Sequence, residues 1–297
     1  MSGFDAGWLA LREPFDLAAR AASAPLLDWP ALAGRLRSGR DAGAVLQVVD
    51  LGCGTGASLR ALAPRLGGRQ HWRLLDHDPA LLAALPQALS SWAVAQGCRV
   101  ATGDEGMAID GKHLQLTVAW QRADLADLAG VAAIDGAQLV TASALLDLVS
   151  AAWLQALVAR CRAAGASVGW ALSVDDRLRW LPADGADALV HTHFRAHQRR
   201  DKGFGPALGG GAVVEAARFL QRAGYRVVTA PSDWQVDGER SPADLAMLRE
   251  MVDGMAAAAV EQAPEAASAV QAWRQRRQAR LASTRLQVGH TDLLAWL

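Results

Sequence analysis

Residues 50–56 combine an acid with three closely spaced glycines, in the order Asp-Leu-Gly-Cys-Gly-Thr-Gly. Gly52 permits a sharp turn, Gly54 lets a ligand approach the backbone, and Gly56 lets a following helix begin close to a sheet. The free amides at the start of such a helix favour a carboxylate or a phosphate. Because the last glycine comes one position earlier than in the Gly-x-Gly-x-x-Gly pattern of dinucleotide enzymes, the stretch predicts a ligand-binding loop of another kind.

A second acid, Asp76, ends the next strand-like run, residues 72–76. An acid at that place can accept hydrogen bonds from both ribose hydroxyls of a nucleoside ligand. Asp78 and Pro79 are typical of a helix N-terminus, but capping explains Asp78 and not Asp76. We therefore expect Asp76 to bind a ribose.

These two acids can meet only if their strands end at one edge of a sheet. Residues 45–50 are apolar and Val-rich, which predicts a buried strand, and Leu59, Leu62 and Leu66 predict a helix over 57–66 that ends at Gly67. Alternating strands and helices follow to the end of the chain. The pattern predicts an α/β fold: a Rossmann-like, doubly wound, seven-stranded, mostly parallel sheet with helices on both faces. The further predicted elements are helices 80–96, 151–164 and 213–223, and strands 98–102, 113–122, 138–143, 167–174, 225–230 and 285–290.

Several segments lie outside this alternation. Asp110-Gly111 predicts the turn of a hairpin inserted before the third strand. Residues 1–43 predict an N-terminal helical cap, in which Pro14 opens one helix and Asp28 caps another. We expect a second domain over 44–297, with substrate-side insertions at about 175–212 and 241–283.

Three details of these segments are open to a direct structural check. The first helix should bury the side of Phe15, Leu17, Ala18 and Ala21. The fifth strand should close at residues 175–176, and residues 292–297 should form a short tail. The basic run 274–277 should be a solvated helix face.

The glycine loop resembles motif I of the class I S-adenosylmethionine (SAM) dependent methyltransferases, commonly written as hydrophobic-Asp-Leu-Gly-Cys-Gly-Thr-Gly. The resemblance covers roughly residues 44–230, and the final strand by order. It implies that Gly52, Cys53, Gly54 and Gly56 wrap the methionine end of SAM, and that Asp50 helps to hold its ammonium group. Cys53 is interpreted as a small packing residue, although a helix N-terminus favours a thiolate.

The same resemblance implies where the rest of the cofactor lies. His77 would lie against the adenine, Asp124 would bind its amino group, and the Leu125 amide would lie near a ring nitrogen. An alternative for Asp124 is a surface residue that caps a short helix over 125–129. Residues 138–147 resemble motif IV, so Thr141 and Ser143 would border the sulfonium and the transferred methyl.

The implied reaction is in-line attack on that methyl by an O, N, S or C nucleophile, with S-adenosyl-L-homocysteine as product. His193 and His197 share a face of the predicted helix 186–200 and are candidates for a base. Packed histidines satisfied by backbone are the alternative. The pair lacks a third ligand nearby in sequence, so no metal site is predicted.

Contacts to the acceptor are predicted for Asp147, Arg195, Lys202 and Phe204, the last two in a loop that is long enough to be a lid. A solvated basic helix end would equally explain the arginine and lysine. The identity of the acceptor is not readable from the sequence.

Composition narrows the class of protein. The chain has 297 residues and zero formal net charge, which argues against a nucleic-acid partner and for a small-molecule substrate. No run is long enough to cross a membrane, and the start lacks the pattern of a signal peptide. Three widely spaced cysteines favour a reducing compartment, so we expect a cytoplasmic protein.

Two alternatives stay open at this point. An NAD-type oxidoreductase would also use Asp76 for a ribose, but it would leave Asp124 without a purpose. A non-catalytic SAM-binding scaffold would keep the same fold and the same cofactor motifs.

Overall fold

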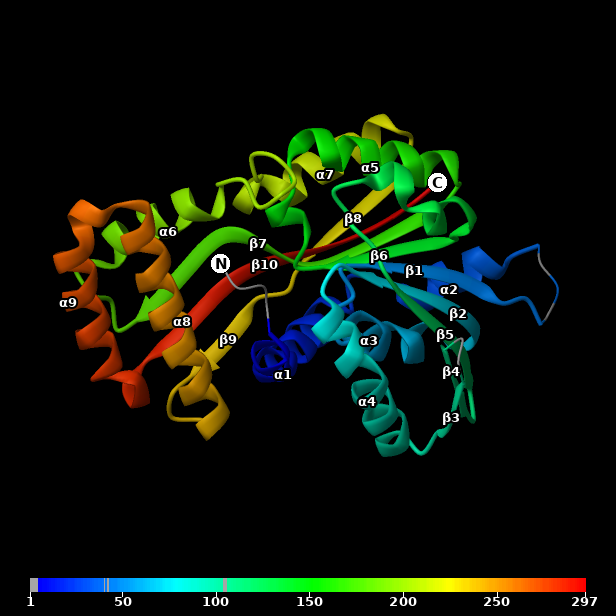
Figure 1. The fold of residues 1–297 in the computed structure, drawn as a ribbon, viewed down its shortest axis with the longest axis horizontal. Helices are drawn as coiled ribbons and strands as arrows, with labels where there is room; N and C mark the ends of the chain where they lie inside the picture. Colours follow the sequence, from blue (N-terminus) through cyan, green and yellow to red (C-terminus); the bar gives the residue numbers. More distant parts are fainter. Residues whose placement is uncertain (1–4, 40, 42, 104–105) are drawn as a thin grey trace.

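In the computed structural model, which describes residues 5–39, 41, 43–103 and 106–297, the strands form one ten-stranded sheet. Its order is β3-β4-β5-β2-β1-β6-β7-β10-β8, and β9 pairs with β10 (Figure 1). The strands are β1 (Leu46–Leu51), β2 (Gly68–Asp76), β3 (Arg99–Gly103), β4 (Gly106–Gly111), β5 (Leu114–Arg122), β6 (Leu139–Ser143), β7 (Ser167–Leu181), β8 (Arg226–Pro231), β9 (Trp234–Asp237) and β10 (Arg285–Trp296).

The centre of the sheet is parallel, with β5, β2, β1, β6 and β7 side by side. Helices α3 (Ala57–Leu66) and α4 (Pro79–Ala95) cover one face, and α5 (Ala151–Ala163) and α7 (Ala212–Arg222) cover the other (Figure 1). Val48 packs into the core on the α3 side and Val49 into the core on the α5 side. Because both faces of β1 are buried, the strand is apolar throughout. This arrangement confirms the predicted α/β fold with a parallel centre and helices on both faces, but the predicted number of seven strands is wrong, because the described residues form ten.

The last strand, β10, lies between β7 and β8 and is antiparallel to both. The predicted tail 292–297 is wrong, because its residues continue β10 to Trp296. Leu293, Leu294 and Ala295 are buried there between the two neighbouring strands. Strand β10 thus pairs with β7 along one side and with β8 along the other.

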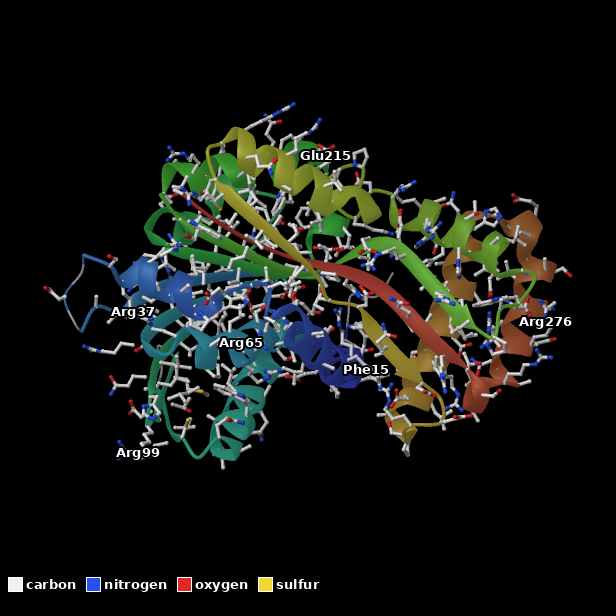
Figure 2. The ribbon with its side chains drawn as sticks, turned by 180° about the vertical axis from the view of Figure 1, so that it is seen from behind. Phe15, Arg37, Arg65, Arg99, Glu215 and Arg276 are labelled. Carbon is white, nitrogen blue, oxygen red and sulfur yellow. The ribbon has the colours of Figure 1, made fainter. Side chains whose placement is uncertain are left out.

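Strands β7 and β10 run well past the central core and carry an extension built from β9, α6 (Asp187–Gln198), α8 (Pro242–Gln262) and α9 (Ala267–Gln278). Figure 2 shows Arg276 on this extension and Arg99 on the inserted strands, at opposite ends of the molecule. The prediction that the fifth strand closes at residues 175–176 is wrong. Trp180 and Leu286 continue the paired strands and pack on Met247 and Leu248 of α8.

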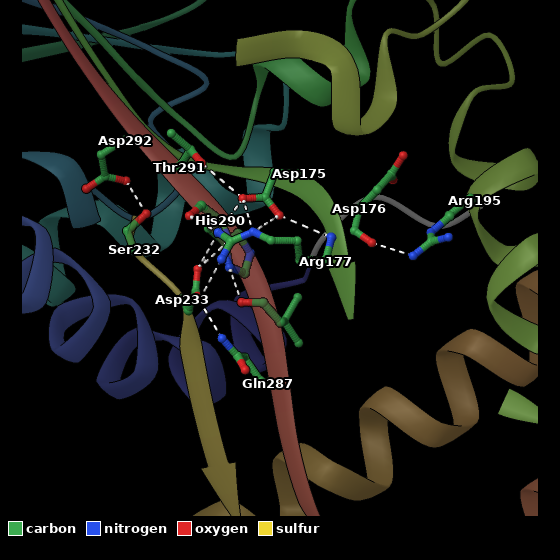
Figure 3. Close-up of polar contacts among 11 residues, drawn as sticks. Asp175, Asp176, Arg177, Arg195, Ser232, Asp233, Gln287, His290, Thr291 and Asp292 are labelled. Atoms are coloured by element: carbon green, nitrogen blue, oxygen red, sulfur yellow. Dashed lines mark hydrogen bonds and ion pairs between the residues drawn. The ribbon is translucent and has the colours of Figure 1, made fainter. Parts of the chain in front are cut away.

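A polar network joins the strands where they leave the core (Figure 3). Arg177 donates to both Asp175 and Asp233, and Thr291 donates to Asp175. Asp176 has a φ of 65°, a left-handed value that only a well-supported non-glycine residue adopts. The network therefore fixes the junction between the core and the extension.

The N-terminal segment forms α1 (Ala6–Ser23) and α2 (Trp29–Arg37). Asp28 caps α2 as predicted, but Pro14 does not open a helix, since Asp5 caps α1 and Pro14 lies within it. Of the four residues predicted to lie on the buried side of this helix, only Phe15 is buried. Leu17, Ala18 and Ala21 are exposed, and the buried stripe of α1 holds Arg12, Asp16, Ala19 and Arg20 instead.

Two further local predictions need correction. The insertion before β5 has two strands, β3 and β4, and β4 pairs with both β3 and β5. The predicted Asp110-Gly111 turn is wrong, because both residues belong to β4 and pair with Gln115 and Leu114, so the turn is at Lys112-His113. The predicted helix 125–129 is a turn followed by a single 3-10 turn, Leu128–Gly130. Short elements of this kind have too few residues for a periodic pattern.

Candidate functional site

The glycine loop follows β1 and leads directly into α3. Gly52, Gly54 and Gly56 have φ values of 66°, 54° and 84°, all in the left-handed region that favours glycine. The Cys53 N–H donates to the Leu75 carbonyl at 2.9 Å, which ties the loop to β2. The loop thus has the backbone shape that the sequence predicts.

Cys53 is buried in this loop beside two acids. Burial raises the pKa of its thiol well above the ordinary value, and the charges of Asp50 and Asp76 raise it further. The thiol therefore stays protonated, which supports a packing role and not a nucleophilic one.

Asp50, near the end of β1, is fully buried. Thr141 Oγ1 donates to Asp50 Oδ1 at 2.7 Å, whereas Oδ2 has no hydrogen-bond partner within 3.5 Å among the described residues, although the Ser58 hydroxyl is close enough to lower the pKa of the carboxyl group. Burial raises the pKa of Asp50 to about 6, although Thr141, Arg20 and Ser58 draw it down. A buried carboxylate oxygen without a donor is costly, so Oδ2 suits a ligand that brings an N–H group.

Asp76 ends β2 and is 5% exposed. Its Oδ2 accepts from the Gly54 N–H at 2.8 Å, and its Oδ1 accepts from the Asp78 N–H at 3.0 Å. The sequence motifs did not reveal this bond between the second acid and the glycine loop. The His77 side chain lies beside it and is exposed, with Nδ1 3.5 Å from Asp76 Oδ1.

Asp124 lies just beyond β5, at the same edge of the sheet. Asp76 pairs with Arg122 in register, and the Ala123 N–H donates to the Asp76 carbonyl at 2.9 Å. The Asp124 side chain is exposed and accepts from the Ala126 N–H at 2.9 Å. Leu125 is buried, and its carbonyl accepts from Trp153 Nε1. The strand ends that carry Asp50, Asp76 and Asp124 are therefore neighbours.

Helix α1 covers the glycine loop. A Cβ on Gly54 would lie 3.0 Å from the Leu9 side chain, and Glu13 pairs with Arg60 of α3 at 2.7 Å. Arg20 Nη2 donates to Ser143 Oγ at 2.8 Å, at the end of β6. The Leu9 side chain thus lies close to Gly54, on the side toward which a Cβ would point.

A cleft of about 730 Å³ lies beside the covered loop, between α1 and α4. Ala10 of α1, Thr55 of the loop and Trp92 of α4 contribute to its wall.

The sequence interpretation missed the role of α1. Arg12, Asp16 and Arg20 are spaced by four residues, a spacing that places them on one stripe of a helix. This polar stripe indicates the buried side of the helix, whereas the prediction followed the apolar residues Leu17, Ala18 and Ala21.

Asp147 lies in a single 3-10 turn, Leu146–Leu148, after β6. It is 8% exposed and its Oδ1 has no hydrogen-bond partner. Burial raises the pKa of Asp147 to about 6, and the charges of Arg12 and Asp176 act on it in opposite directions. The carboxyl group is therefore close to both α1 and β7, and it has one oxygen free for a ligand.

Arg195 of α6 reaches back to β7, where it donates to the Asp176 carbonyl. Arg199 pairs with the Asp176 carboxylate at 2.9 Å. Gly210 lies against the same carboxylate, so closely that any side chain at this position would clash with it. These contacts link the end of α6 to the strand that passes Asp147.

The predicted histidines lie on α6, which packs on α8 in the extension. His197 is buried, with Nε2 3.3 Å from Glu261 Oε2, and burial lowers its pKa, followed by the charge of Lys202. His193 is half-buried on the same helix. The contacts of the described residues do not join either histidine to Asp50, Ser143 or Asp147.

The predicted lid begins beside these histidines and returns to the core. Phe204 packs edge-on against Trp153 at 5.4 Å between ring centroids, and the Leu208 N–H donates to the Val149 carbonyl at 2.9 Å. The loop is therefore anchored at the start of α5, close in sequence to Asp147.

In the described part of the chain, no group of three or more His, Cys, Asp or Glu side chains is arranged to hold a metal ion. None of the helices in that part is both long and apolar enough to cross a membrane.

The sequence matches no protein-family model and no curated protein. Among solved structures, a cyclopropane-fatty-acyl-phospholipid synthase-like protein from Lactobacillus casei ATCC 334 shares 14% identity over 99% of this chain and 95% of its own, with a TM-score of 0.50.

Other solved structures match less well. A phosphoethanolamine N-methyltransferase 2 from Haemonchus contortus, in complex with S-adenosylhomocysteine, is 11% identical over 100% of this chain and 58% of its own, with a TM-score of 0.43. An arsenic(III) S-adenosylmethionine methyltransferase from Chlamydomonas reinhardtii is 15% identical over 94% and 73%, with a TM-score of 0.40. A parallel central sheet with helices on both faces gives the chain a Rossmann-like fold, and the first of the three structures is similar to it in fold.

Proposed function

We propose that this protein is a methyltransferase that moves the methyl group of SAM to an O, N, S or C nucleophile of a small molecule. The observation that carries the proposal is the pair Asp50 and Asp76, joined through the glycine loop. Asp76 accepts from Gly54 in the middle of the loop, and Asp50 keeps one buried oxygen without a donor. An ammonium group placed over the loop would supply that donor.

On the cofactor side, Asp50 and the loop formed by Gly52, Cys53, Gly54 and Gly56 bind the methionine part. Asp76 binds the ribose, and His77 and Asp124 with the Leu125 amide border the adenine. The exposed His77 ring beside Asp76 supports this assignment, because a free aromatic face is what stacking on a base requires. Bound SAM supplies an activated methyl group whose leaving sulfur departs neutral.

The protein's own residues then have to align the acceptor and exclude water. Asp147 is the acceptor contact with the best support, since its carboxyl group is buried with a free oxygen. Ser143 precedes it along the same edge of the sheet. Arg195 and Phe204 support this region through β7 and α5. His193, His197 and Lys202 stay candidates on the side of the extension.

Calorimetry with the purified full chain tests the proposal. We expect S-adenosyl-L-homocysteine to bind with a micromolar or lower dissociation constant and NAD to bind at least 100-fold more weakly. Preferential affinity for NAD would favour the oxidoreductase instead. Binding of S-adenosyl-L-homocysteine without turnover of any acceptor would favour a SAM-binding scaffold.

A further inference from the structure

Arg20 is a buried arginine that has no carboxylate partner among the residues the structure describes. Its residue is 3% exposed, and its guanidinium makes one recorded hydrogen bond, from Nη2 to Ser143 Oγ at 2.8 Å. Across the described residues, no Asp or Glu oxygen forms an ion pair with it within 4.0 Å. Arg12, two turns earlier on the same stripe, pairs with Asp16 at 2.9 Å. A buried cation with no anion is unfavourable, so Arg20 lacks a partner that its neighbour has.

The charged groups near Arg20 do not supply the missing anion. Arg65 of α3 lies close enough that the charge of Arg20 lowers its pKa, and Arg65 Nη1 donates to the Arg20 carbonyl at 3.4 Å. Asp292, the acid that acts on Arg65, is already engaged. It accepts from the Ser23 and Ser232 hydroxyls and from the Leu172 N–H. The two arginines thus lie near each other, and none of the carboxylates in the described residues, Asp292 included, forms an ion pair with Arg20.

Asp50 has the complementary deficit, an unpaired buried acceptor. Its Oδ2 is buried without a donor, and the charge of Arg20 reaches it although the two form no ion pair. Thr141 and Ser143, two residues apart on β6, position the acid and the arginine respectively. A positively charged group is missing at Asp50, and a negatively charged group is missing at Arg20.

We propose that Arg20 binds the α-carboxylate of the methionine part of SAM, with Ser143 as its positioning residue. This inference rests on the proposed function and extends it. A single zwitterion supplies both missing groups, its ammonium to Asp50 and its carboxylate to Arg20. The N-terminal helix α1 is then part of the cofactor site and not only a cover over the sheet edge.

The test compares two ligands that differ in that carboxylate. S-Adenosyl-L-homocysteine carries the amino acid, whereas 5′-methylthioadenosine keeps the thioether nucleoside and lacks it. Measured by calorimetry, the affinity for S-adenosyl-L-homocysteine should fall roughly 10- to 100-fold in Arg20→Met, the range of a lost charge-assisted contact. The affinity for 5′-methylthioadenosine should change by less than about twofold. Arg20→Lys should recover part of the loss, and Arg37→Met on α2 should change neither ligand.

The outcomes separate the inference from the proposed function. If the wild type binds neither ligand, the proposed function fails and takes the inference with it. If Arg20→Met keeps wild-type affinity for S-adenosyl-L-homocysteine, or loses both ligands by the same factor, the carboxylate assignment is wrong while the methyltransferase proposal stands. Should Arg20→Met not fold, Ser143→Ala gives the same contrast, with an expected loss of a few-fold confined to S-adenosyl-L-homocysteine.

Discussion

Thr141 donates a hydrogen bond to one oxygen of the Asp50 carboxyl group, and the other oxygen has no donor among the described residues. This fully buried acid is therefore oriented, but only one of its two oxygens is hydrogen-bonded. The hydroxyl of Thr141 also approaches the Val49 carbonyl at 3.3 Å, which keeps its side chain directed along β1. A carboxyl group held in this way resists rotation, so its free oxygen has a defined position for a ligand.

Asp50→Asn should stabilise the unliganded protein and weaken cofactor binding. Burial raises the folded-state pKa of Asp50 to about 6, above the unfolded value. The wild type therefore loses stability as pH rises from about 4 to about 6, whereas the variant does not. We expect the Tm of the variant to exceed that of the wild type by a few degrees at pH 7. Thermal unfolding of both proteins from pH 4 to 8 checks this, and an equal Tm at all pH values would contradict it.

Asp76→Ala should weaken S-adenosyl-L-homocysteine binding by one to two orders of magnitude, about 1.4–2.8 kcal/mol, since a bidentate ribose contact is removed. The Gly54 and Asp78 N–H groups also lose their acceptor. Each can cost on the order of 1 kcal/mol, so the Tm should fall as well. Calorimetry and thermal unfolding measure the two effects. A lower Tm with unchanged affinity would show that Asp76 only closes the loop.

Asp147→Asn should lower turnover without changing cofactor affinity, if its carboxylate accepts the proton of the acceptor. Because burial raises the pKa of Asp147 to about 6, wild-type kcat/KM should fall as pH drops below 6. The variant should be slower by roughly 100-fold or more and lose that pH dependence. The measurement needs an acceptor that the wild type methylates. Unchanged kcat/KM in the variant would exclude Asp147 as the base.

His193→Ala provides the competing test on the same acceptor. If His193 is the base, turnover falls while the affinity for S-adenosyl-L-homocysteine stays within about twofold of the wild type. If the ring only packs between α6 and α8, the Tm falls and the kinetics of the folded protein stay unchanged. His197→Ala, compared with Glu261→Gln, separates a catalytic role from the contact between these two side chains.

Arg277→Met should destabilise the extension. The sequence predicts that Arg277 is solvated with the rest of the run 274–277, but it is 4% exposed, pairs with Asp187 at 2.6 Å and stacks over Trp180, with Cζ 4.7 Å from the ring centroid. Removing one partner of a buried pair costs about 3–5 kcal/mol, so we expect a clearly lower Tm. Arg274→Met is the matched control, because its pair with Asp253 is exposed and should leave the Tm nearly unchanged. Equal effects of the two variants would contradict the buried role.

The sequence alone determined the elements whose ends are set by local chemistry. The helix over 57–66 was predicted with its observed bounds, because Gly56 and Gly67 adopt left-handed conformations that only glycine accepts without strain. Ser150 begins α5 through a side-chain cap, and the predicted helix over 151–164 agrees with the observed Ala151–Ala163 to within one residue. Such signals act within a few residues, so a single sequence contains them in full.

Only the tertiary structure decided what depends on distant partners. The buried side of α1 holds Arg12, Asp16 and Arg20, since Trp234 and Ser143, far along the chain, supply the hydrogen bonds that offset their burial. The length of β10 is set by two neighbouring strands, and the burial of Arg277 by Trp180 and Asp187. A polar residue becomes buried only when another element brings it a partner, and no periodic pattern records that event. Sequence therefore predicted the glycine loop and its backbone shape, and the fold brought Arg20 close enough for its charge to act on Asp50.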